Sequence, residues 1–400
     1  MAETAGLEVV GRTWQRFEHP DPATYIRSGK VEEVDMMTRD LDADVVLFDD
    51  ELSPRHQREL EEAFHEKIKV IDRTALILDI FAQHAQTAEG QLQVELAQLE
   101  YRLPRLTRMW THLARQAGGQ AGGSGGGVGV RGPGEKQIEM DRREIGRRIA
   151  TVKEELEKVR QRREQHRAKR QQTALPVIAI VGYTNAGKST LLNRLSGSDI
   201  WSADMLFATL DPTTRRVKMP SGREALFTDT VGFIQKLPTQ IVAAFRATLE
   251  EIADADIVLH IVDATHPNAR EQIEAVDDTL AELEVDHLPR VMALNKVDRL
   301  PEGEDVTEKF DPGVTAIPIS ALTGYNIKTL LMAIEAVMER YLESIHVFLP
   351  YDRGDLMSLF YERGQVEEEN HKADGVSLLG RLPGRLFPYF EPYLVAEEEA

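Results

Sequence analysis

Residues 177–197 read VIAIVGYTNAGKSTLLNRLSG, a short apolar run followed by a glycine-bounded loop and an amphipathic stretch. The loop fits GxxxxGK[ST]: glycines let backbone N–H groups turn toward phosphates, the lysine neutralises phosphate oxygens, and the serine hydroxyl can ligate magnesium. A purely structural glycine turn is the alternative, but the order of strand, loop and helix makes it a poor competitor. We therefore predict a nucleotide phosphate site formed by Gly182, Tyr183, Thr184, Asn185, Ala186, Gly187, Lys188, Ser189 and Thr190.

A second box follows where the run LFTD ends, at Asp229, Thr230, Val231 and Gly232. After a phosphate loop, a carboxylate at this place can hold magnesium through a water, and a glycine N–H can meet the γ-phosphate. These four residues alone are weak evidence, and their order after the phosphate loop makes them strong. We predict that Lys188 and Gly232 act on the transferred phosphate, and that Ser189 and Asp229 hold the metal.

Two further boxes indicate the base. They consist of Asn295, Lys296 and Asp298 after one apolar run, and Ser320, Ala321 and Leu322 after the next. A carboxylate such as Asp298 can accept hydrogen bonds from both the ring N–H and the exocyclic amine of guanine, whereas adenine offers no such pair of donors. Hydrogen bonds to charged groups contribute about 1.5 to 3 kcal/mol each, so two separate guanine from adenine by roughly several hundredfold or more. The predicted nucleotides are GTP and GDP.

The apolar runs 176–182, 223–232, 257–264, 290–296 and 316–321 alternate with helical stretches. This alternation predicts the buried strands of a doubly wound α/β sheet. Ahead of them, short apolar runs at 7–11, 43–49 and 68–72 predict a small α/β domain with a parallel sheet. Behind them, an apolar run from about residue 346, an amphipathic stretch and two shorter β-like runs predict a small α+β domain.

Two stretches with coiled-coil spacing lie between the first two regions. Their apolar positions are Leu92, Leu96, Leu99, Leu103, Leu106, Trp110 and Leu113, and then Ile138, Ile145, Ile149, Val152, Leu156 and Val159. Pro104 should kink the first helix. Neither apolar seam can stay exposed to water, so we predict an antiparallel helical hairpin. Its tip is the loop 118–134, which holds ten glycines and no acid; a flexible linker is the alternative.

These patterns divide the chain into four predicted domains. They are an N-terminal α/β domain (1–90), a basic helical hairpin (91–172), a nucleotide-binding domain (173–345) and a C-terminal α+β domain (346–400).

Charge is distributed unevenly along the 400 residues, whose net charge is −19. Residues 102–172 hold 18 Lys or Arg against 8 Asp or Glu, which leaves a net charge of −29 for the rest. Such asymmetry marks the hairpin as a candidate contact for a polyanion, with a solvated charged helix as the equally plausible alternative. The candidate RNA-binding cations are Arg131, Lys136, Arg142, Arg143, Arg147 and Arg148.

Composition excludes several classes of protein. The absence of cysteine excludes disulfides, zinc-thiolate sites, iron–sulfur clusters and a cysteine nucleophile. No apolar run reaches eighteen residues, and the start MAETAGLEVV lacks the pattern of a signal peptide. We expect a cytoplasmic monomer without a membrane span.

GYTNAGKSTLLN, LFATLDPTTR, DTVGFI, NKVD and SA, preceded by GVRGPGEKQIEMDRREI, together resemble the HflX family of ribosome-associated GTPases. The resemblance runs through nearly the whole chain, from LEVVGR to PYDRGDLMSLFYERG. It implies a GTPase that binds the large ribosomal subunit, inserts its hairpin near the peptidyl-transferase centre of the 23S rRNA, and splits stalled ribosomes.

The threonine that ligates magnesium from the first mobile loop is ambiguous on the residues alone, because Thr209, Thr213 and Thr214 all qualify. The segment 207–212 resembles the FTTLxP switch of a related GTPase class, which implies Thr209 as the ligand. The remaining nucleotide contacts predicted from this segment are Phe207, Ala208, Leu210 and Asp211.

Two residues bear on the rate of hydrolysis. Phe233 stands where signalling GTPases place a water-orienting glutamine, which predicts slow intrinsic turnover and activation by a large partner. Asn185 either caps the phosphate loop or helps to hold potassium, as the matching asparagine does in potassium-dependent GTPases. The alternative function is a GTP-gated RNA-binding module or ribosome-assembly factor that has little need of hydrolysis.

Overall fold

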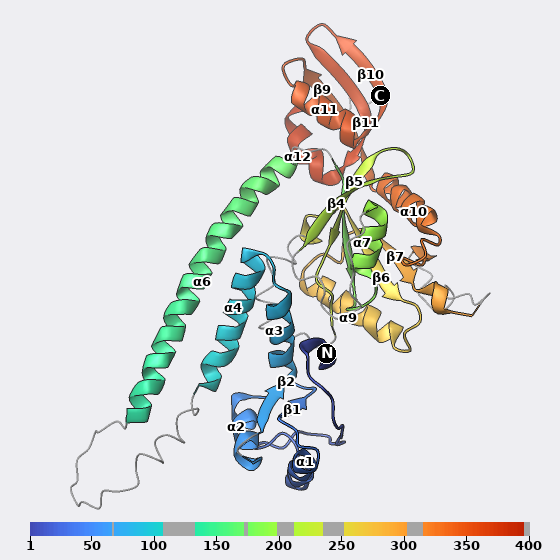
Figure 1. Cartoon of the computed structure of the whole chain (residues 1–400). Helices are drawn as coiled ribbons and strands as arrows, with labels where there is room; N and C mark the ends of the chain where they lie inside the picture. The colour runs from blue at the N-terminus through green and yellow to red at the C-terminus, as the bar shows by residue number, and fades with distance from the viewer. Residues whose placement is uncertain are drawn as a thin grey trace, which may run out of the picture. The chain divides into compact units, whose positions relative to one another are not determined.

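The structure is a computed structural model that describes residues 1–65, 68–106, 133–171, 175–197, 212–234, 252–301 and 315–395 (Figure 1). Two compact units make up the described chain. One holds Met1–Arg160, and the other holds Gln161–Lys236 together with the residues from Ala247 onward.

The N-terminal unit begins with a two-stranded parallel sheet, β1 (Val45–Phe48) and β2 (Lys69–Asp72). Helices α1 (Ser28–Asp40) and α2 (Pro54–Ala63) pack against it, and Ser53 caps α2 by accepting a hydrogen bond from the His56 N–H. The shared core consists of Ile26, Val31, Val34, Leu52, Leu60, Phe64, Ile68 and Val70. The predicted parallel α/β arrangement is therefore present.

The prediction of a strand at residues 7–11 was wrong. Among the described residues no strand pairs with this segment, and its two valines, Val9 and Val10, are 39% and 49% exposed. An apolar run becomes a strand only where a neighbouring strand satisfies its backbone groups, and here none does.

Helices α3 (Arg73–His84) and α4 (Ala88–Arg102) follow the sheet, and the long helix α6 (Pro133–Gln171) runs beside α4 in the opposite direction (Figure 1). Salt bridges from Arg148 to Glu95 (2.6 Å) and from Lys153 to Glu100 (2.8 Å) join α6 to α4. Val152 is fully buried, and the other predicted seam positions of α6 are half-buried. An antiparallel helical pair is thus present.

Three details of the hairpin differ from the prediction or lie beyond the described residues. The regular helix is interrupted at Pro104: α4 ends at Arg102, and the 3-10 turn η2 (Leu103–Arg105) follows. The predicted continuation beyond Leu106 lies outside the described residues. Proline has no N–H for the carbonyl four residues earlier, and its ring clashes with that carbonyl. The last two residues of the predicted loop, 133 and 134, begin α6. Trp110, Leu113 and the loop up to residue 132 lie outside the described residues.

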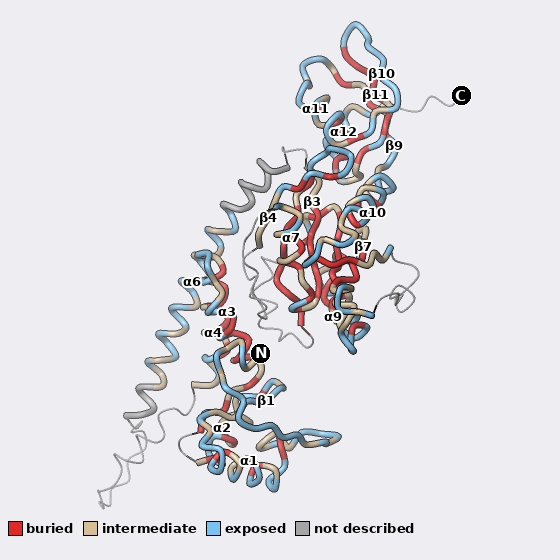
Figure 2. The backbone as a smooth tube through the Cα atoms, turned by 45° about the vertical axis from the view of Figure 1, so that its right-hand side comes forward, coloured by how far each residue is buried: buried red, intermediate tan, exposed pale blue. Residues whose placement is uncertain are grey.

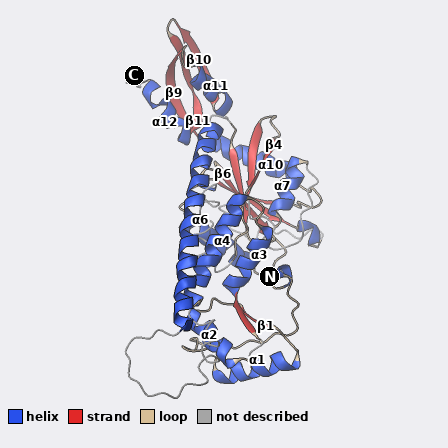
Figure 3. Ribbon diagram, turned by 60° about the vertical axis from the view of Figure 1, so that its left-hand side comes forward, coloured by secondary structure: helices blue, strands red, loops and turns tan. Residues whose placement is uncertain are grey.

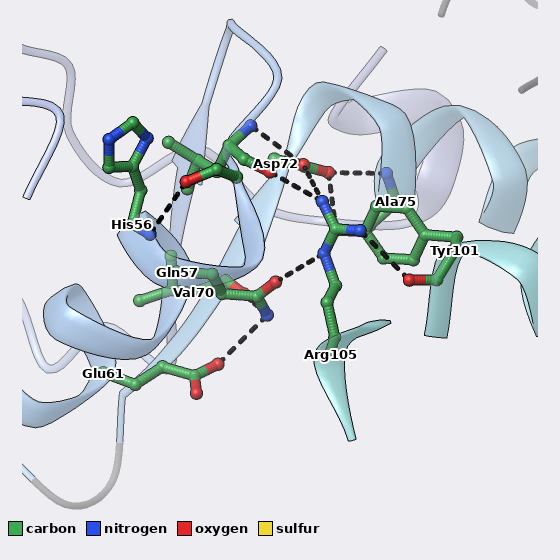
Figure 4. Close-up of polar contacts among 10 residues, drawn as sticks. His56, Gln57, Glu61, Val70, Asp72, Ala75, Tyr101 and Arg105 are labelled. Atoms are coloured by element: carbon green, nitrogen blue, oxygen red, sulfur yellow. Dashed lines mark hydrogen bonds and ion pairs between the residues drawn. The ribbon is translucent and has the colours of Figure 1, made fainter. Parts of the chain in front are cut away.

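A buried polar cluster ties the end of α4 to the strands (Figure 4). Asp72 caps α3 through the Ala75 N–H (2.8 Å) and accepts hydrogen bonds from the Tyr101 hydroxyl (2.9 Å) and the Leu52 N–H (3.1 Å). Arg105 lies 3.4 Å from the second Asp72 oxygen and donates to the Leu52 carbonyl at 2.6 Å. Asp72 is fully buried and its pairing with Arg105 satisfies both charges.

The second unit is built on a six-stranded sheet in the order β4-β5-β3-β6-β7-β8. The parallel strands are β3 (Val177–Gly182), β5 (Glu224–Asp229), β6 (Ile257–Asp263), β7 (Arg290–Asn295) and β8 (Thr315–Pro318). Helices α7 (Lys188–Ser196) and α10 (Ile327–Arg340) contribute to the core on one face, and α9 (Ala269–Glu282) packs on the other. This is the predicted doubly wound fold, and Figure 2 shows its strands as the most buried part of this unit.

The edge strand β4 (Thr213–Lys218) was not predicted and runs antiparallel to β5. It reads TTRRVK, so the usual signature of a buried strand is missing, and only Val217 is buried. A strand paired on one edge can be polar because it contributes few side chains to the core.

The C-terminal part forms the predicted α+β arrangement. An antiparallel sheet in the order β10-β11-β9 combines β9 (Leu342–Pro350), β10 (Gln365–Lys372) and β11 (Gly375–Pro383), with α11 (Gly354–Arg363) against it (Figure 3). The first strand begins at Leu342, so the predicted boundary at residue 346 falls inside it. Phe360 and Phe390 meet edge-to-face in the core at 5.7 Å.

Candidate nucleotide site

The phosphate loop joins β3 to α7 and adopts a backbone that its sequence requires. Gly182, Asn185 and Gly187 have φ angles of 150°, 62° and 100°. A Cβ on Gly182 would come within 2.3 Å of the Ile261 carbonyl oxygen, and one on Gly187 within 2.2 Å of the Asn295 side-chain nitrogen. Glycine is therefore needed at both positions for space as well as for backbone angle.

Lys188 is buried at the start of α7, with 6% of its surface exposed. Its ammonium donates to the carbonyls of Gly182 (3.0 Å) and Tyr183 (2.9 Å), which hold it over the loop. Burial lowers the pKa of Lys188 to about 8, against the opposing effect of the Asp229 carboxylate. A phosphate placed here would supply the negative charge that favours the protonated form.

Ser189 and Asp229 already contact each other: the Ser189 hydroxyl donates to a carboxylate oxygen of Asp229 at 2.7 Å. Asp229 is the last residue of β5 and is almost fully buried. A hydroxyl and a carboxylate beside a phosphate loop form a donor set that suits Mg²⁺, which takes its other ligands from water and phosphates. Among the described residues no group of three or more His, Cys, Asp or Glu side chains could hold a metal alone.

The loop after β5 lies directly against the phosphate loop. The Thr184 N–H donates to the Phe233 carbonyl (2.8 Å), and the Phe233 N–H donates to the Gly182 carbonyl (3.1 Å). A Cβ on Gly232 would lie 3.0 Å from the Lys188 ammonium nitrogen and 2.8 Å from a methyl carbon of Thr184. The boxes at 182–189 and 229–232 therefore form one site, as their order in the chain predicts.

The Phe233 ring is buried, with 1% exposure. It neither reaches solvent nor carries a polar atom, so it cannot orient an attacking water. Thr230 in the same loop anchors the turn, since its hydroxyl donates to the Ile180 carbonyl at 2.7 Å.

The predicted base-recognition residues lie at the ends of β7 and β8. Asn295 braces the site: its amide nitrogen donates to the Ala186 carbonyl (2.8 Å) and its oxygen accepts from the Ala321 N–H (2.9 Å). Asp298 is exposed in the turn η3 (Val297–Arg299), which leaves its carboxylate accessible to a base. Ser320 is buried, whereas Leu322 is 63% exposed.

One residue of this region was missed by the sequence reading. Asp263, at the end of β6, forms a 2.7 Å ion pair with Lys296, which holds a left-handed backbone at φ 69°. Burial alone would raise the pKa of Asp263, but hydrogen bonds from Lys296 and Thr265 outweigh it and lower the pKa. The signal was available, since this carboxylate ends a buried strand of the same sheet.

The mobile-loop residues Phe207, Ala208, Thr209, Leu210 and Asp211 lie outside the described residues. The two alternatives to Thr209 belong to β4 and are not loop hydroxyls. The Thr214 hydroxyl is 3.0 Å from that of Thr228 on the neighbouring strand.

The candidate RNA-binding arginines lie along α6. Arg142 and Arg147 are exposed and form no ion pair within the described part of the chain, whereas Arg143 pairs with Glu139 (3.0 Å) and Arg148 with Glu95. Arg131 and the side chain of Lys136 lie outside the described residues. No helix in the described ranges has the length and apolar character needed to cross a membrane.

The fold and these boxes define a P-loop GTPase. Family models match four successive stretches: a GTP-binding GTPase N-terminal region (1–82) and middle region (84–170), a 50S ribosome-binding GTPase domain (177–296) and an HflX C-terminal domain (305–385). The chain belongs to the HflX family of GTPases, and it binds and hydrolyses GTP.

Two relatives illustrate the match. GTPase HflX of Caldanaerobacter subterraneus subsp. tengcongensis is 45% identical over 381 residues, which cover 94% of this chain and 85% of that protein. GTPase HflX of Escherichia coli K12 is 42% identical over 387 residues, 96% of this chain and 88% of that protein. Among solved structures, a GTP-binding protein of Sulfolobus solfataricus in complex with GDP is 26% identical, with a TM-score of 0.44 and coverage of 85% of this chain and 93% of that chain.

Proposed function

We propose that this GTPase binds the large ribosomal subunit near the peptidyl-transferase centre and splits or rescues stalled ribosomes. The observation that carries the proposal is the basic hairpin: residues 102–172 hold a net charge of +10 in a chain that is otherwise strongly acidic. The family description of residues 177–296, a 50S ribosome-binding GTPase, supports the same partner.

The geometry of α6 supports phosphate contacts. The Arg142 and Arg147 guanidinium groups are exposed without an ion-pair partner in the described residues, so they are available to RNA phosphates without breaking an internal pair. Arg148, in contrast, is engaged with both Glu95 oxygens at 2.6 and 2.7 Å. Cations on such an arm fix position on RNA without reading sequence.

We infer a part in hydrolysis for each predicted residue of the nucleotide site. Ser189, and Asp229 through a water, would hold Mg²⁺, which would supply positive charge against the phosphates. Lys188 binds the phosphate oxygens, the Gly232 N–H meets the γ-phosphate, and Thr209 completes the metal ligands. Because the Phe233 ring is buried and apolar, the water-orienting group comes from another part of the complex.

The test combines turnover with cosedimentation. Isolated protein should hydrolyse GTP slowly, and purified large subunits should raise the rate at least about tenfold, since they supply what Phe233 lacks. Cosedimentation with separated subunits should show preferential binding to the large subunit with a GTP analogue.

Deletion of residues 118–130 should spare binding and basal turnover but abolish splitting. A fast enzyme that ignores ribosomes would refute the proposal.

Potassium is a further candidate cofactor. Asn185 has an exposed side chain at φ 62° in the phosphate loop. If it holds a cation, replacing potassium with sodium should lower basal turnover, and Asn185→Ala should erase that difference. Equal rates in the two salts would leave Asn185 only a structural role.

The competing function is a GTP-gated RNA-binding module or assembly factor. Its signature would be nucleotide-dependent binding to subunits that is the same with GTP and with a non-hydrolysable GTP analogue, together with no splitting by the unaltered protein.

A further inference from the structure

The segment that precedes α1 has two chemically different sides. Thr13, Gln15 and Phe17 each contact another part of the N-terminal unit. The Thr13 hydroxyl donates to Glu33 of α1 (3.0 Å), the Gln15 side chain accepts from the Arg27 N–H (3.1 Å), and the Phe17 ring meets the Tyr25 ring edge-on at 5.8 Å.

The alternate residues, Arg12, Trp14 and Arg16, are exposed. Trp14 is 86% exposed, more than any other large apolar residue in the described ranges. No hydrogen bond or ion pair within the part of the chain that the structure covers engages either arginine. Arg12, Trp14 and Arg16 alternate in the sequence with the three residues that make these contacts, and this is the spacing that places side chains on one side of an extended chain.

A tryptophan side chain normally buries more than about 150 Å² of surface, which stabilises the folded protein. An exposed indole does not contribute this stabilisation. The residues on either side of Trp14 are Arg12, Thr13, Gln15 and Arg16, all polar or charged. Trp and Arg are also enriched in protein-binding hot spots, so the test below includes an acidic peptide as the competing ligand. An unpaired nucleotide needs only a flat face for its base and cations for its phosphates.

We propose that Trp14, Arg12 and Arg16 form a binding site for an unpaired RNA nucleotide, with the base stacked on the indole and the neighbouring phosphates paired with the arginines. This deepens the proposed ribosome function by adding a second RNA contact, distinct from the hairpin and located on the segment before α1. The site is sequence-tolerant, because every base offers a π-face.

Indole fluorescence tests the site in the full-length chain without ribosomes. Single-stranded oligoribonucleotides should quench the tryptophan fluorescence of the wild-type protein more than that of Trp14→Phe. Duplex RNA of the same composition should not produce this additional quenching. Trp14→Ala should weaken binding of the single strand by about 5- to 150-fold, the range measured for stacked bases, and Trp14→Phe should retain most of the affinity. Met36→Ala, which removes another exposed apolar side chain of this unit, should change nothing.

Salt dependence separates the arginines from the ring. Arg12→Gln with Arg16→Gln should make the plot of log affinity against log salt shallower by about 0.7 for each phosphate that the arginines no longer neutralise. The site is refuted if duplex RNA quenches equally, if Trp14→Ala binds normally, or if only an acidic peptide gives the quench. Ribosome-stimulated turnover is measured separately, so failure of stacking and failure of the proposed function give different results.

Discussion

Lys188 is a cation held in a buried site before its phosphate partner arrives. Its pKa of about 8 in the folded protein lies below the usual 10.5, so between these values the unfolded chain binds the proton and the folded chain does not. The contribution of this residue to the free energy of unfolding of the nucleotide-free protein therefore rises as pH increases from 8 to 10.5. Below pH 8 the buried charge destabilises the fold to its full extent.

The first prediction follows from that shift. Phosphates raise the pKa of Lys188 again, so GTP binding between about pH 8 and 10 should be accompanied by proton uptake. Calorimetry in buffers with different ionisation enthalpies measures this uptake. Lys188→Met should bind GTP more weakly and without uptake, and Lys188→Ala should lose nearly all turnover. Buffer-independent enthalpies for the wild type would contradict the shift.

The second prediction concerns Asp298, whose accessible carboxylate is expected to pair with guanine. Asp298→Asn exchanges an acceptor for a donor, which fits the additional oxygen of xanthine, so preference should change from GTP to XTP. Competition binding with GTP, XTP and ATP measures the change. Asn295→Asp is not a suitable control, because Asn295 braces Ala186 and Ala321. A variant that still prefers GTP would remove Asp298 from base recognition.

At this scale the sequence was informative where chemistry demands fixed residue types. Gly182, Gly187, Ser189 and Asp229 could be predicted together because a phosphate and a metal would accept few other residue types. The structure gives the two glycines positive φ angles and places Ser189 against Asp229. Asp263 was missed because its partner, Lys296, lies beyond the end of a different strand, and only the strand register brings the two together. Thr213 and Thr214 were interpreted as loop hydroxyls because the polar sequence around them does not predict that they pair with β5.

Among the elements, α6 combines two kinds of arginine, and the third prediction separates them. Arg142→Glu with Arg147→Glu should weaken cosedimentation with large subunits and flatten its salt dependence, because neither group has an ion-pair partner in the described part of the chain. Arg148→Glu should also weaken binding, but by breaking the bidentate ion pair with Glu95.

The matched control is a charge exchange. Adding Glu95→Arg to Arg148→Glu restores an ion pair between α4 and α6, so it should rescue most of the binding that Arg148→Glu removes. It should rescue nothing in the variant altered at residues 142 and 147. If the exchange fails to rescue, Arg148 contacts RNA directly and does not act through the hairpin's own packing.

Helices and strands could be predicted where their own sequence shows a characteristic apolar pattern. They could not be predicted where the structure depends on contacts with another part of the chain. The runs of β3, β6 and β7 are mostly apolar because both faces of the sheet are covered. Residues 7–11 carry a similar apolar signal, yet no strand pairs with them in the described structure. The end of α4 at Arg102 shows the same limit: Pro104 predicts a disruption near this point, and only the structure shows at which residue the regular helix ends.

For the whole molecule, the uneven charge predicts a steep response to salt. If roughly six to ten hairpin cations contact phosphates, affinity for large subunits should fall by about 10³ to 10⁵ between 50 and 200 mM salt. The acidic remainder of the chain disfavours binding elsewhere on RNA. Cosedimentation across a potassium chloride series measures the slope. An affinity that hardly changes over this range would show that few of these cations touch phosphate.

The Asp72 cluster determines how the N-terminal unit responds to force. The hairpin can transmit a force only if its attachment to the N-terminal unit resists rotation. Without the Asp72 cluster, the chain could rotate at the turn that contains Pro104. Rotating the chain there would pull Arg105 from the Leu52 carbonyl and leave the Asp72 carboxylate buried without its cation, a loss of about 3 to 5 kcal/mol, several times thermal energy. A force applied to the chain at Leu106 is therefore transmitted to β2 and α3, because Asp72 and Arg105 oppose rotation at the turn.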